Sequence, residues 1–470
     1  MNTYNPFTQF RSEVYQNFNK RADSMLELVD ALSSNQHARS VAELSLADGF
    51  HYGYSALYKS IAACSLSNQQ LAHLAAPYIP QPARRNFWLL AQDVSSHPRL
   101  YAECLHDRGY VYEPTVIRGN KPVTIGHQYA TVVALPEKEA ADAAWVLPLS
   151  TARVASTADK ELVGAELLHK LLTDPEMPFY GELCVTVQDS SYSKPAYLHA
   201  QARHPNQVAS VRVRGNRCFY RQFQPDPAAA PARGHPQWYG ERFALREPET
   251  WGTPDATHSL KLRNQQGKTY RAEIQVWHNL LMRGKRKPVA LPMQQHPFTL
   301  VRVQLYRDDD TPVYRRALWF IVIGARRAEI PADVAYLAYR QRFDIEHTYR
   351  FGKQRLLLTA YQTPEITHEE TWWRLVHLAY LQLWVARPLA ERLPRPWERY
   401  LPTMRTATPL SPALVQRDCA RIIREFGSPA RTLKPRGYSP GRAAGTPGTT
   451  REHQGIVVKS KKVVAAPVAD

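Results

Sequence analysis

The sequence predicts a mixed α/β protein, whose core of strands and helices follows a helical region and is interrupted by a β-rich one. Between residues 83 and 214, short apolar runs typical of buried strands, such as NFWLLAQD and GELCVTVQD, alternate with a segment of helical spacing, ADKELVGAELLHKLL. Helical spacing also dominates the first 82 residues and returns after residue 331. Strands that precede helices in this way indicate a mixed sheet covered by helices.

The same patterns divide the chain of 470 residues, whose length suggests about three domains. The turn-rich stretch YIPQPARR ends the helical N-terminal region, and the later β-rich region combines Pro and Trp with few helical signals. We expect a helical N-terminal domain at 1–82, an α/β core at 83–214 and 331–400, a β-rich insertion at 215–330, and a basic C-terminal region at 401–470.

The charge of the chain favours a polyanionic partner. Sixty Lys and Arg against 42 Asp and Glu give a net charge of +18, so nucleic acid is the first candidate and an acidic membrane surface the second. The membrane is disfavoured because the longest apolar run, ALWFIVIGA, is far shorter than the roughly 20 residues of a spanning helix. The N-terminus has no apolar signal region, and five scattered cysteines without a C-x-x-C pair indicate neither disulfides nor zinc. We expect a cytoplasmic, nucleoid-associated protein.

The C-terminal region is basic and poor in apolar residues. Residues 421–462 contain ten Lys or Arg and two Glu among many Gly and Pro. This composition predicts a flexible tail. The tail either serves only solubility or contacts the backbone or minor groove of DNA.

A stripe of chemically different side chains is predicted on one helix. In YRQRFDIEHTYRFGK, residues 339–353, Tyr339, Arg342, Glu346 and Lys353 stand at offsets of 0, 3, 7 and 14. At about 100° per residue, these offsets fall within an arc of roughly 60°. One side of the helix would therefore carry a phenol, a guanidinium, a carboxylate and an ammonium group.

Two interpretations of this stripe are open. Opposite charges four residues apart, as in Arg342 with Glu346 and Glu346 with Arg350, usually mark a solvated helix face. Phe343 on one side and Tyr349 on the other border the stripe with apolar side chains. That border favours the wall of a cleft.

Acidic residues elsewhere suggest a metal site. Asp93 stands at the exit of NFWLLAQD and Asp189 at the exit of GELCVTVQD, so both could meet Glu346 at one edge of a sheet. Close carboxylates repel each other unless a cation lies between them. Two Mg²⁺ ions, for which Mn²⁺ could substitute, would relieve this repulsion and promote cleavage of a phosphodiester.

These residues resemble a known family. The spacing of Tyr339, Arg342, Glu346 and Lys353 matches, without a gap, the Tyr-Arg-Glu-Lys signature of one branch of bacterial insertion-sequence DDE transposases. VTVQDSSYSKPAYL resembles the second-aspartate segment of this branch, and LLAQDVSSHP is a looser match to the first. The resemblance covers roughly residues 80 to 390. It implies an RNase H-like catalytic core, with the β-rich region inserted before the last catalytic acid and an N-terminal domain that binds DNA.

The resemblance also implies roles for individual residues. The three acids would be the catalytic metal ligands, and four residues of the signature helix or its surroundings would contact the DNA backbone. Trp319, on an apolar strand before that helix, would stack on a base displaced from the transposon end, although a Trp in such a strand is usually part of the core. The implied metal ligands are Asp93, Asp189 and Glu346, and the implied DNA contacts are Tyr339, Arg342, Arg350, Lys353 and Trp319.

The resemblance implies a cut-and-paste transposase. Such a protein binds the inverted repeats of its element, cuts there, and uses the free 3′-hydroxyl to attack target DNA, acting as a homodimer in a synaptic complex with double-stranded DNA. Two alternatives share the fold. One is a domesticated or inactive DNA-binding protein, and the other is a structure-specific nuclease without strand transfer.

Overall fold

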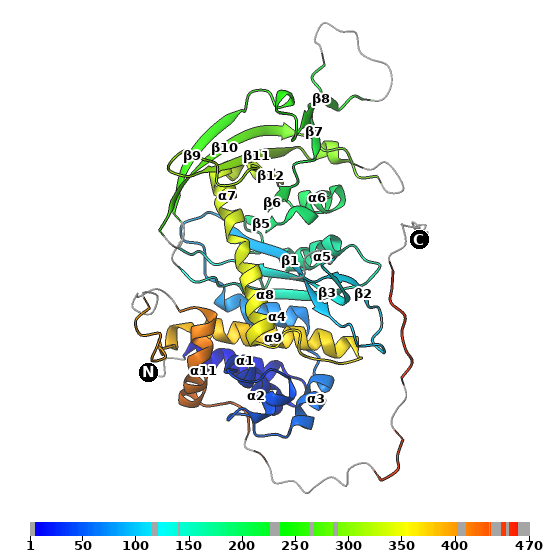
Figure 1. Cartoon of the computed structure of the whole chain (residues 1–470), viewed down its shortest axis with the longest axis vertical. Helices are drawn as coiled ribbons and strands as arrows, with labels where there is room; N and C mark the ends of the chain where they lie inside the picture. Colours follow the sequence, from blue (N-terminus) through cyan, green and yellow to red (C-terminus); the bar gives the residue numbers. More distant parts are fainter. Residues whose placement is uncertain are drawn as a thin grey trace.

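The computed structural model describes most of the chain, and the molecule is elongated (Figure 1). The N-terminal helices lie at one end of its long axis, the β-rich region lies at the other, and the middle of the sheet lies between them. The described residues are 5–114, 121–139, 142–225, 236–263, 267–284, 290–401, 410–431, 433, 443–447 and 451–458.

A ten-stranded mixed sheet runs through the molecule in the order β2-β3-β1-β5-β6-β12-β11-β10-β9, with β4 beside β3. Strands β1, β5 and β6 are parallel, and β3 and β12 flank them in the antiparallel sense. The strands are β1 (Trp88–Pro98), β2 (Gly109–Tyr112), β3 (Val123–Ala134), β4 (Leu147–Val154), β5 (Cys184–Gln188), β6 (Gln207–Val213), β9 (Ala256–Arg263), β10 (Thr269–Leu280), β11 (Phe298–Tyr306) and β12 (Leu318–Ile323).

The central strands form from the apolar runs identified in the sequence. All five residues of β5 are buried, as expected for a parallel strand that is covered on both faces. Strand β1 is longer than predicted, because its pairing with β5 ends at Ala91 but its pairing with β3 continues to Pro98. Asp93 therefore lies within a strand and not at its exit.

Strands of the β-rich region, which was expected to be an insertion at 215–330, continue the sheet. Strands β9 to β12 extend the sheet from β6, and β12 pairs with β6 from Trp319 opposite Val213 to Ile323 opposite Ala209. This pairing satisfies the backbone groups of β6 that an edge strand would expose. Strands β7 (Cys218–Gln222) and β8 (Tyr239–Ala244) form a small sheet of their own.

Helices cover both faces of the sheet. On one face lie α5 (Lys160–Leu172) and α6 (Pro195–Ala202), and Gln92 of β1 donates a hydrogen bond to an α5 carbonyl. On the other face lie α8 (Phe343–Arg355) and α9 (Ile366–Ala386), because side chains alternate along a strand and His97 of β1 contacts Trp373 of α9. Helix α7 (Ala332–Gln341) directly precedes α8.

The N-terminal helices, which lie within the domain expected at 1–82, share a hydrophobic core with α9. The hydroxyl of Ser33 donates to the carbonyl of Ala379 over 3.2 Å, and the Gln382 amide donates to Asp30 over 2.8 Å. One hydrophobic cluster joins these helices to the sheet. The N-terminal helices are α1 (Pro6–Asn17), α2 (Ala22–Ser33), α3 (Tyr54–Ala63) and α4 (Asn68–Ala75).

The described part of the C-terminal region includes one helix, most of which precedes the predicted tail. Helix α11 (Pro412–Phe426) buries Val415, Cys419 and Ile422 and packs on α2 and α9. Farther on, the backbone N–H of Val457 donates to the Arg108 carbonyl over 2.8 Å, so that residues 451–458 run beside β2. Much of the remaining predicted tail lies outside the described residues.

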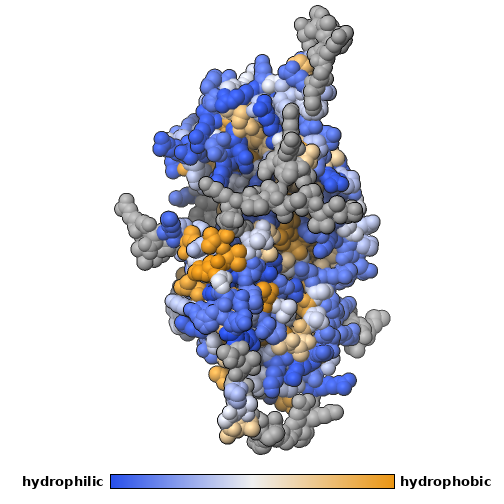
Figure 2. Space-filling model, turned by 90° about the vertical axis from the view of Figure 1, so that its right-hand side faces the viewer, coloured by the Kyte–Doolittle hydropathy of each residue, from blue (hydrophilic) through white to orange (hydrophobic). Residues whose placement is uncertain are grey.

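The surface of the molecule is largely polar. Figure 2 shows one face on which hydrophilic residues predominate and hydrophobic residues gather in patches. Among the helices that the structure describes, none is long and apolar enough to cross a membrane.

Candidate active site

The parallel pairing of β1 and β5 places two acids side by side. Ala91 pairs with Val187, and Asp93 and Asp189 each lie two residues farther along, which puts their side chains on the same face. Beyond β5, Asp189 starts a short turn in which its carboxylate accepts hydrogen bonds from the backbone N–H of Ser191 over 2.9 Å and from the Ser191 hydroxyl over 2.7 Å. This turn fixes the carboxylate.

Helix α8 brings the third acid to the same place. The Tyr349 hydroxyl donates to the Asp93 carbonyl over 3.1 Å, which fixes α8 against β1. Arg342 then links the acids: its Nη2 lies 2.7 Å from Glu346 Oε1, and its Nη1 lies 3.8 Å from Asp93 Oδ2. Asp93 and Glu346 therefore share the guanidinium of Arg342, and Asp189 lies close enough to Asp93 to affect its pKa. That the three acids form one catalytic site stays a prediction.

Asp93 and Glu346 differ in burial. The Asp93 side chain is 21% exposed and that of Glu346 is 47% exposed. The pKa of Asp93 is raised to about 6, mainly by burial and to a smaller extent by the carboxylates of Asp189 and Glu346, while Arg342 opposes this rise. Asp189 and Glu346 therefore each lie within electrostatic reach of Asp93.

The signature segment is not one continuous helix. Helix α7 ends at Gln341 and α8 starts at Phe343. At Arg342 the backbone is tightened, because its N–H donates to the Tyr339 carbonyl over 3.0 Å, a three-residue spacing typical of a 3₁₀ turn. Tyr339 consequently lies at the end of α7, buried against Phe320 with ring centroids 4.4 Å apart. The predicted single stripe holds only for the residues from Arg342 onward.

Two basic residues of the signature helix face solvent. Arg350 and Lys353 are both exposed on α8. Partial desolvation lowers the pKa of Lys353, although the nearby Glu113 and Asp93 act in the opposite direction. Both side chains are therefore accessible from the solvent.

Trp319 lies in an aromatic core and not on the surface. It is 5% exposed, and its ring centroid lies 5.0 Å from that of Trp251 and 5.7 Å from that of Trp277. The guanidinium of Arg302 lies 6.0 Å from its ring. These neighbours cover the ring that a displaced base would need.

Two tyrosines beside the acids were not counted among the predicted site residues. Tyr192 is 1% exposed, and its hydroxyl has no hydrogen-bond partner among the described residues. Burial, followed by the charge of Asp93, raises its pKa. Tyr349 supports Asp93 through its hydroxyl. Each tyrosine stands three residues after an acid, at Asp189 and at Glu346, and that spacing was the available signal.

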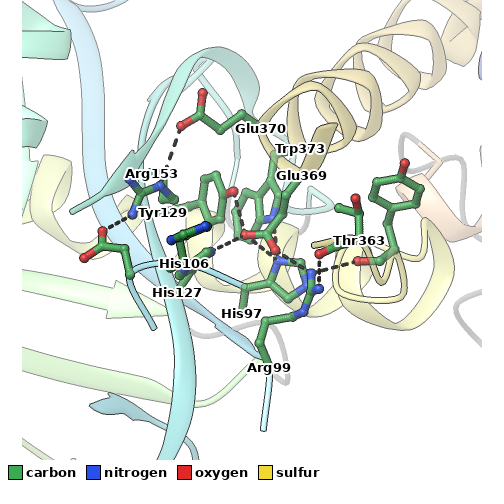
Figure 3. A network of polar contacts seen from close by, with 12 residues as sticks. His97, Arg99, His106, His127, Tyr129, Arg153, Thr363, Glu369, Glu370 and Trp373 are labelled. Carbon is green, nitrogen blue, oxygen red and sulfur yellow. Dashed lines mark hydrogen bonds and ion pairs between the residues drawn. The ribbon is translucent and has the colours of Figure 1, made fainter. Parts of the chain in front are cut away.

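A buried polar network supports β1 beyond the acids (Figure 3). Glu369 of α9 is fully buried, pairs with Arg99, and accepts hydrogen bonds from Tyr129 over 2.8 Å and from His127 over 2.7 Å. Trp373 donates to His97 over 3.0 Å. No sequence pattern indicated this network, because its members are distant along the chain.

The oxygen atoms of the acids are suitable ligands for a hard divalent cation, but the side chains are not arranged around a common ion position. Carboxylate oxygens are the donors that Mg²⁺ prefers, so the three acidic side chains supply suitable ligand atoms. Among the described residues, however, no three His, Cys, Asp or Glu are arranged to hold an ion. The Arg342 guanidinium contacts both Asp93 and Glu346 instead.

Two acids of a mixed sheet, with a third on the helix that packs against it, define a candidate site for phosphodiester chemistry. The chain matches the family described as DDE superfamily endonuclease over residues 13–279, more than half of its length, and therefore belongs to that family. The match includes Asp93 and Asp189 and ends before α8. No curated protein matches the chain. Membership implies a transposase-like nuclease activity with DNA as substrate, and such nucleases generally use divalent metal ions.

Proposed function

We propose that the chain is a transposase of the Tyr-Arg-Glu-Lys branch of bacterial insertion-sequence transposases. The observation that carries this proposal is the meeting of the signature helix with the strand acids, through the contacts of Arg342 with Asp93 and Glu346. If the signature residues only formed a solvated helix face, Arg342 would not be expected to contact Asp93. The family match supports the same reaction class independently, because it ends before this helix.

The acids would hold two Mg²⁺ ions. When bound, such ions activate the attacking oxygen and stabilise the leaving oxygen of a phosphodiester. The side chains of the chain perform the other tasks. Tyr349 and the Ser191 N–H fix β1 and Asp189, and the exposed cations Arg350 and Lys353 attract the DNA backbone.

The proposed reaction has two stages on the same site. The protein binds the inverted repeats of its element and hydrolyses the phosphodiester at each end. The freed 3′-hydroxyl then attacks target DNA, which joins the element to its new position. Because two ends must be handled together, the active form is a homodimer in a synaptic complex.

Substitution of the acids tests this proposal. Asp93→Asn, Asp189→Asn and Glu346→Gln should each abolish Mg²⁺-dependent cleavage and leave binding to DNA ends intact, because the acids hold metal and not DNA. A cleavage assay on a DNA duplex that contains a transposon end measures the activity, and a gel-shift assay on the same duplex measures binding.

Glu166→Gln is the matched control, since Glu166 is an exposed acid on α5, on the opposite face of the sheet. It should leave both quantities unchanged. Near-normal cleavage by any one of the three acid variants would remove that residue from the site. Cleavage without joined products in the wild type would favour a nuclease without strand transfer, and end binding without cleavage would favour a domesticated protein.

A further inference from the structure

Arg342 is an unusual cation for a helix surface. The residue is only 4% exposed, and its guanidinium lies over two rings, 4.7 Å from Phe343 and 5.6 Å from Tyr339. Its Nη atoms face Glu346 and Asp93, whereas its Nε has no hydrogen-bond partner among the residues that the structure describes. A buried N–H without a hydrogen-bond acceptor costs free energy, so this arrangement of the guanidinium is not its most stable one.

The guanidinium of Arg342 lies where a metal ion bound to Asp93 and Glu346 would supply positive charge. A cation between Asp93 and Glu346 relieves the repulsion between two carboxylates, which otherwise favours protonation of one of them. Arg342 supplies that positive charge from the protein itself. The acids are suitable ligands for a divalent cation, yet no three His, Cys, Asp or Glu among the described residues are arranged to hold one. The charge of Arg342 explains this difference, because it already neutralises the acids.

We propose that Arg342 is a resident counter-ion that competes with the divalent cation for Asp93 and Glu346, and that a DNA phosphate draws its guanidinium away when the substrate binds. This inference rests on the proposed function and adds a positioning role to one residue. The guanidinium fork suits a phosphate as well as it suits carboxylates. Metal loading and DNA binding are thereby coupled, so that the free protein carries little bound metal.

The tightened backbone at Arg342 suits such an exchange. The residue joins α7 to α8, and its N–H and carbonyl make the three-residue hydrogen bonds of the junction, to Tyr339 over 3.0 Å and from Ile345 over 3.2 Å. Its side chain can change partners without moving α8, because Tyr349 holds that helix to β1 independently. Arg350 and Lys353 on the same helix can attract the phosphate first.

Binding of Mn²⁺ to the full chain without DNA tests the competition directly. Arg342→Gln should bind Mn²⁺ at least about tenfold more tightly than the wild type, because the competing charge is gone. Free Mn²⁺ is counted by electron paramagnetic resonance. Adding a short DNA duplex should tighten Mn²⁺ binding by the wild type and leave Arg342→Gln unchanged.

Two further variants keep the test decisive. Arg355→Gln removes an exposed arginine from the same helix and should bind Mn²⁺ as the wild type does. Arg342→Lys keeps a charge but cannot contact two carboxylates with one planar group, so its affinity should fall between the other two. It serves as the second reporter if Arg342→Gln melts early.

The possible failures are distinguishable. If Mn²⁺ binds the wild type and Arg342→Gln equally, and Asp93→Asn abolishes both, the acids are a metal site but Arg342 is not its competitor. If Asp93→Asn and Glu346→Gln leave the Mn²⁺ affinity unchanged, the acids are not the metal site, and both the proposed function of these acids and the inference about Arg342 are wrong. A duplex that leaves the Mn²⁺ affinity of the wild type unchanged would overturn the coupling to DNA.

Discussion

A contact of Trp319 with DNA and a structural role of Trp319 in the core require opposite degrees of exposure of its ring. Stacking requires an open ring face, but Trp251 and Trp277 lie 5.0 and 5.7 Å away between ring centroids. Strand β12 also pairs with β6 on one side and β11 on the other. Exposing the ring would therefore require a rearrangement of several buried aromatic residues, which makes a structural role the stronger expectation.

Trp319→Ala should lower the free energy of unfolding by about 3 to 5 kcal/mol, the usual cost of truncating a buried tryptophan. Thermal melting measures this change. Trp397→Ala is the matched control, because Trp397 is 69% exposed and should tolerate the change. A well-folded Trp319→Ala whose cleavage defect is rescued by an abasic site at the transposon end would instead show that the ring stacks on a displaced base.

At the scale of elements, the sequence was most informative where a signal is local. The apolar runs of β1 and β5 predicted strands, and their acids followed at equivalent positions, so the meeting of Asp93 with Asp189 could be anticipated. The pairing of β12 with β6 could not, because it joins residues more than a hundred positions apart and leaves no periodic pattern. The sequence therefore could not predict that strands of the β-rich region continue the sheet.

The signature helix shows a second limit. Helical periodicity predicts which side chains share a side, but not what covers that side or where the backbone tightens. Tyr339 is buried against Phe320 from a distant strand, and Arg342 breaks the helix while it contacts Asp93. Glu346 and Lys353 both lie beyond the break, on the uninterrupted helix α8, and their spacing of seven residues puts them on the same side of it.

Deletion of residues 432–470 should weaken binding to all DNA duplexes alike while leaving α11 in place. The deleted segment carries seven Lys or Arg, and for every phosphate that the tail no longer neutralises, the slope of log affinity against log salt should fall by about 0.9. Titrations at several salt concentrations measure the slope. Arg451→Gln should change the slope little, because Arg451 pairs with Glu365 over 3.2 Å. An unchanged slope after the full deletion would mean that the tail does not contact DNA.

At the scale of the whole molecule, the sheet, the N-terminal helices and α9 form one core. Helix α9 lies at its centre and carries several buried polar side chains. Glu369 and Trp373 fix it to β1 and β3 (Figure 3), while Gln382 fixes it to α2. The strand that carries Asp93 is thus held by the same helix that holds the N-terminal region, so disruption of this helix would affect the site and the core together.

This shared core should make the protein sensitive to mild acid. Burial lowers the pKa of His97 to about 4 and that of His377 to about 3, and the nearby Arg374 adds to the shift of His377. An unfolded histidine binds a proton near pH 6.5. As the pH falls below that value, the unfolded chain gains protons that the folded chain does not, so stability falls. Glu369, whose pKa is lowered to about 2, adds a further decrease only below about pH 4.5.

His377→Gln should flatten this pH dependence. Each histidine that stays neutral in the folded state lowers the stability by up to about 1.4 kcal/mol per pH unit between its two pKa values. Urea unfolding at pH 7.5, 5.5 and 4.5 should therefore show a smaller fall for His377→Gln than for the wild type, whatever the absolute stability of the variant. His453→Gln, which replaces a histidine that is 76% exposed, should keep the steep dependence of the wild type. Equal slopes for His377→Gln and the wild type would mean that His377 accepts its proton inside the fold, and that α9 is not the acid-sensitive element of the core.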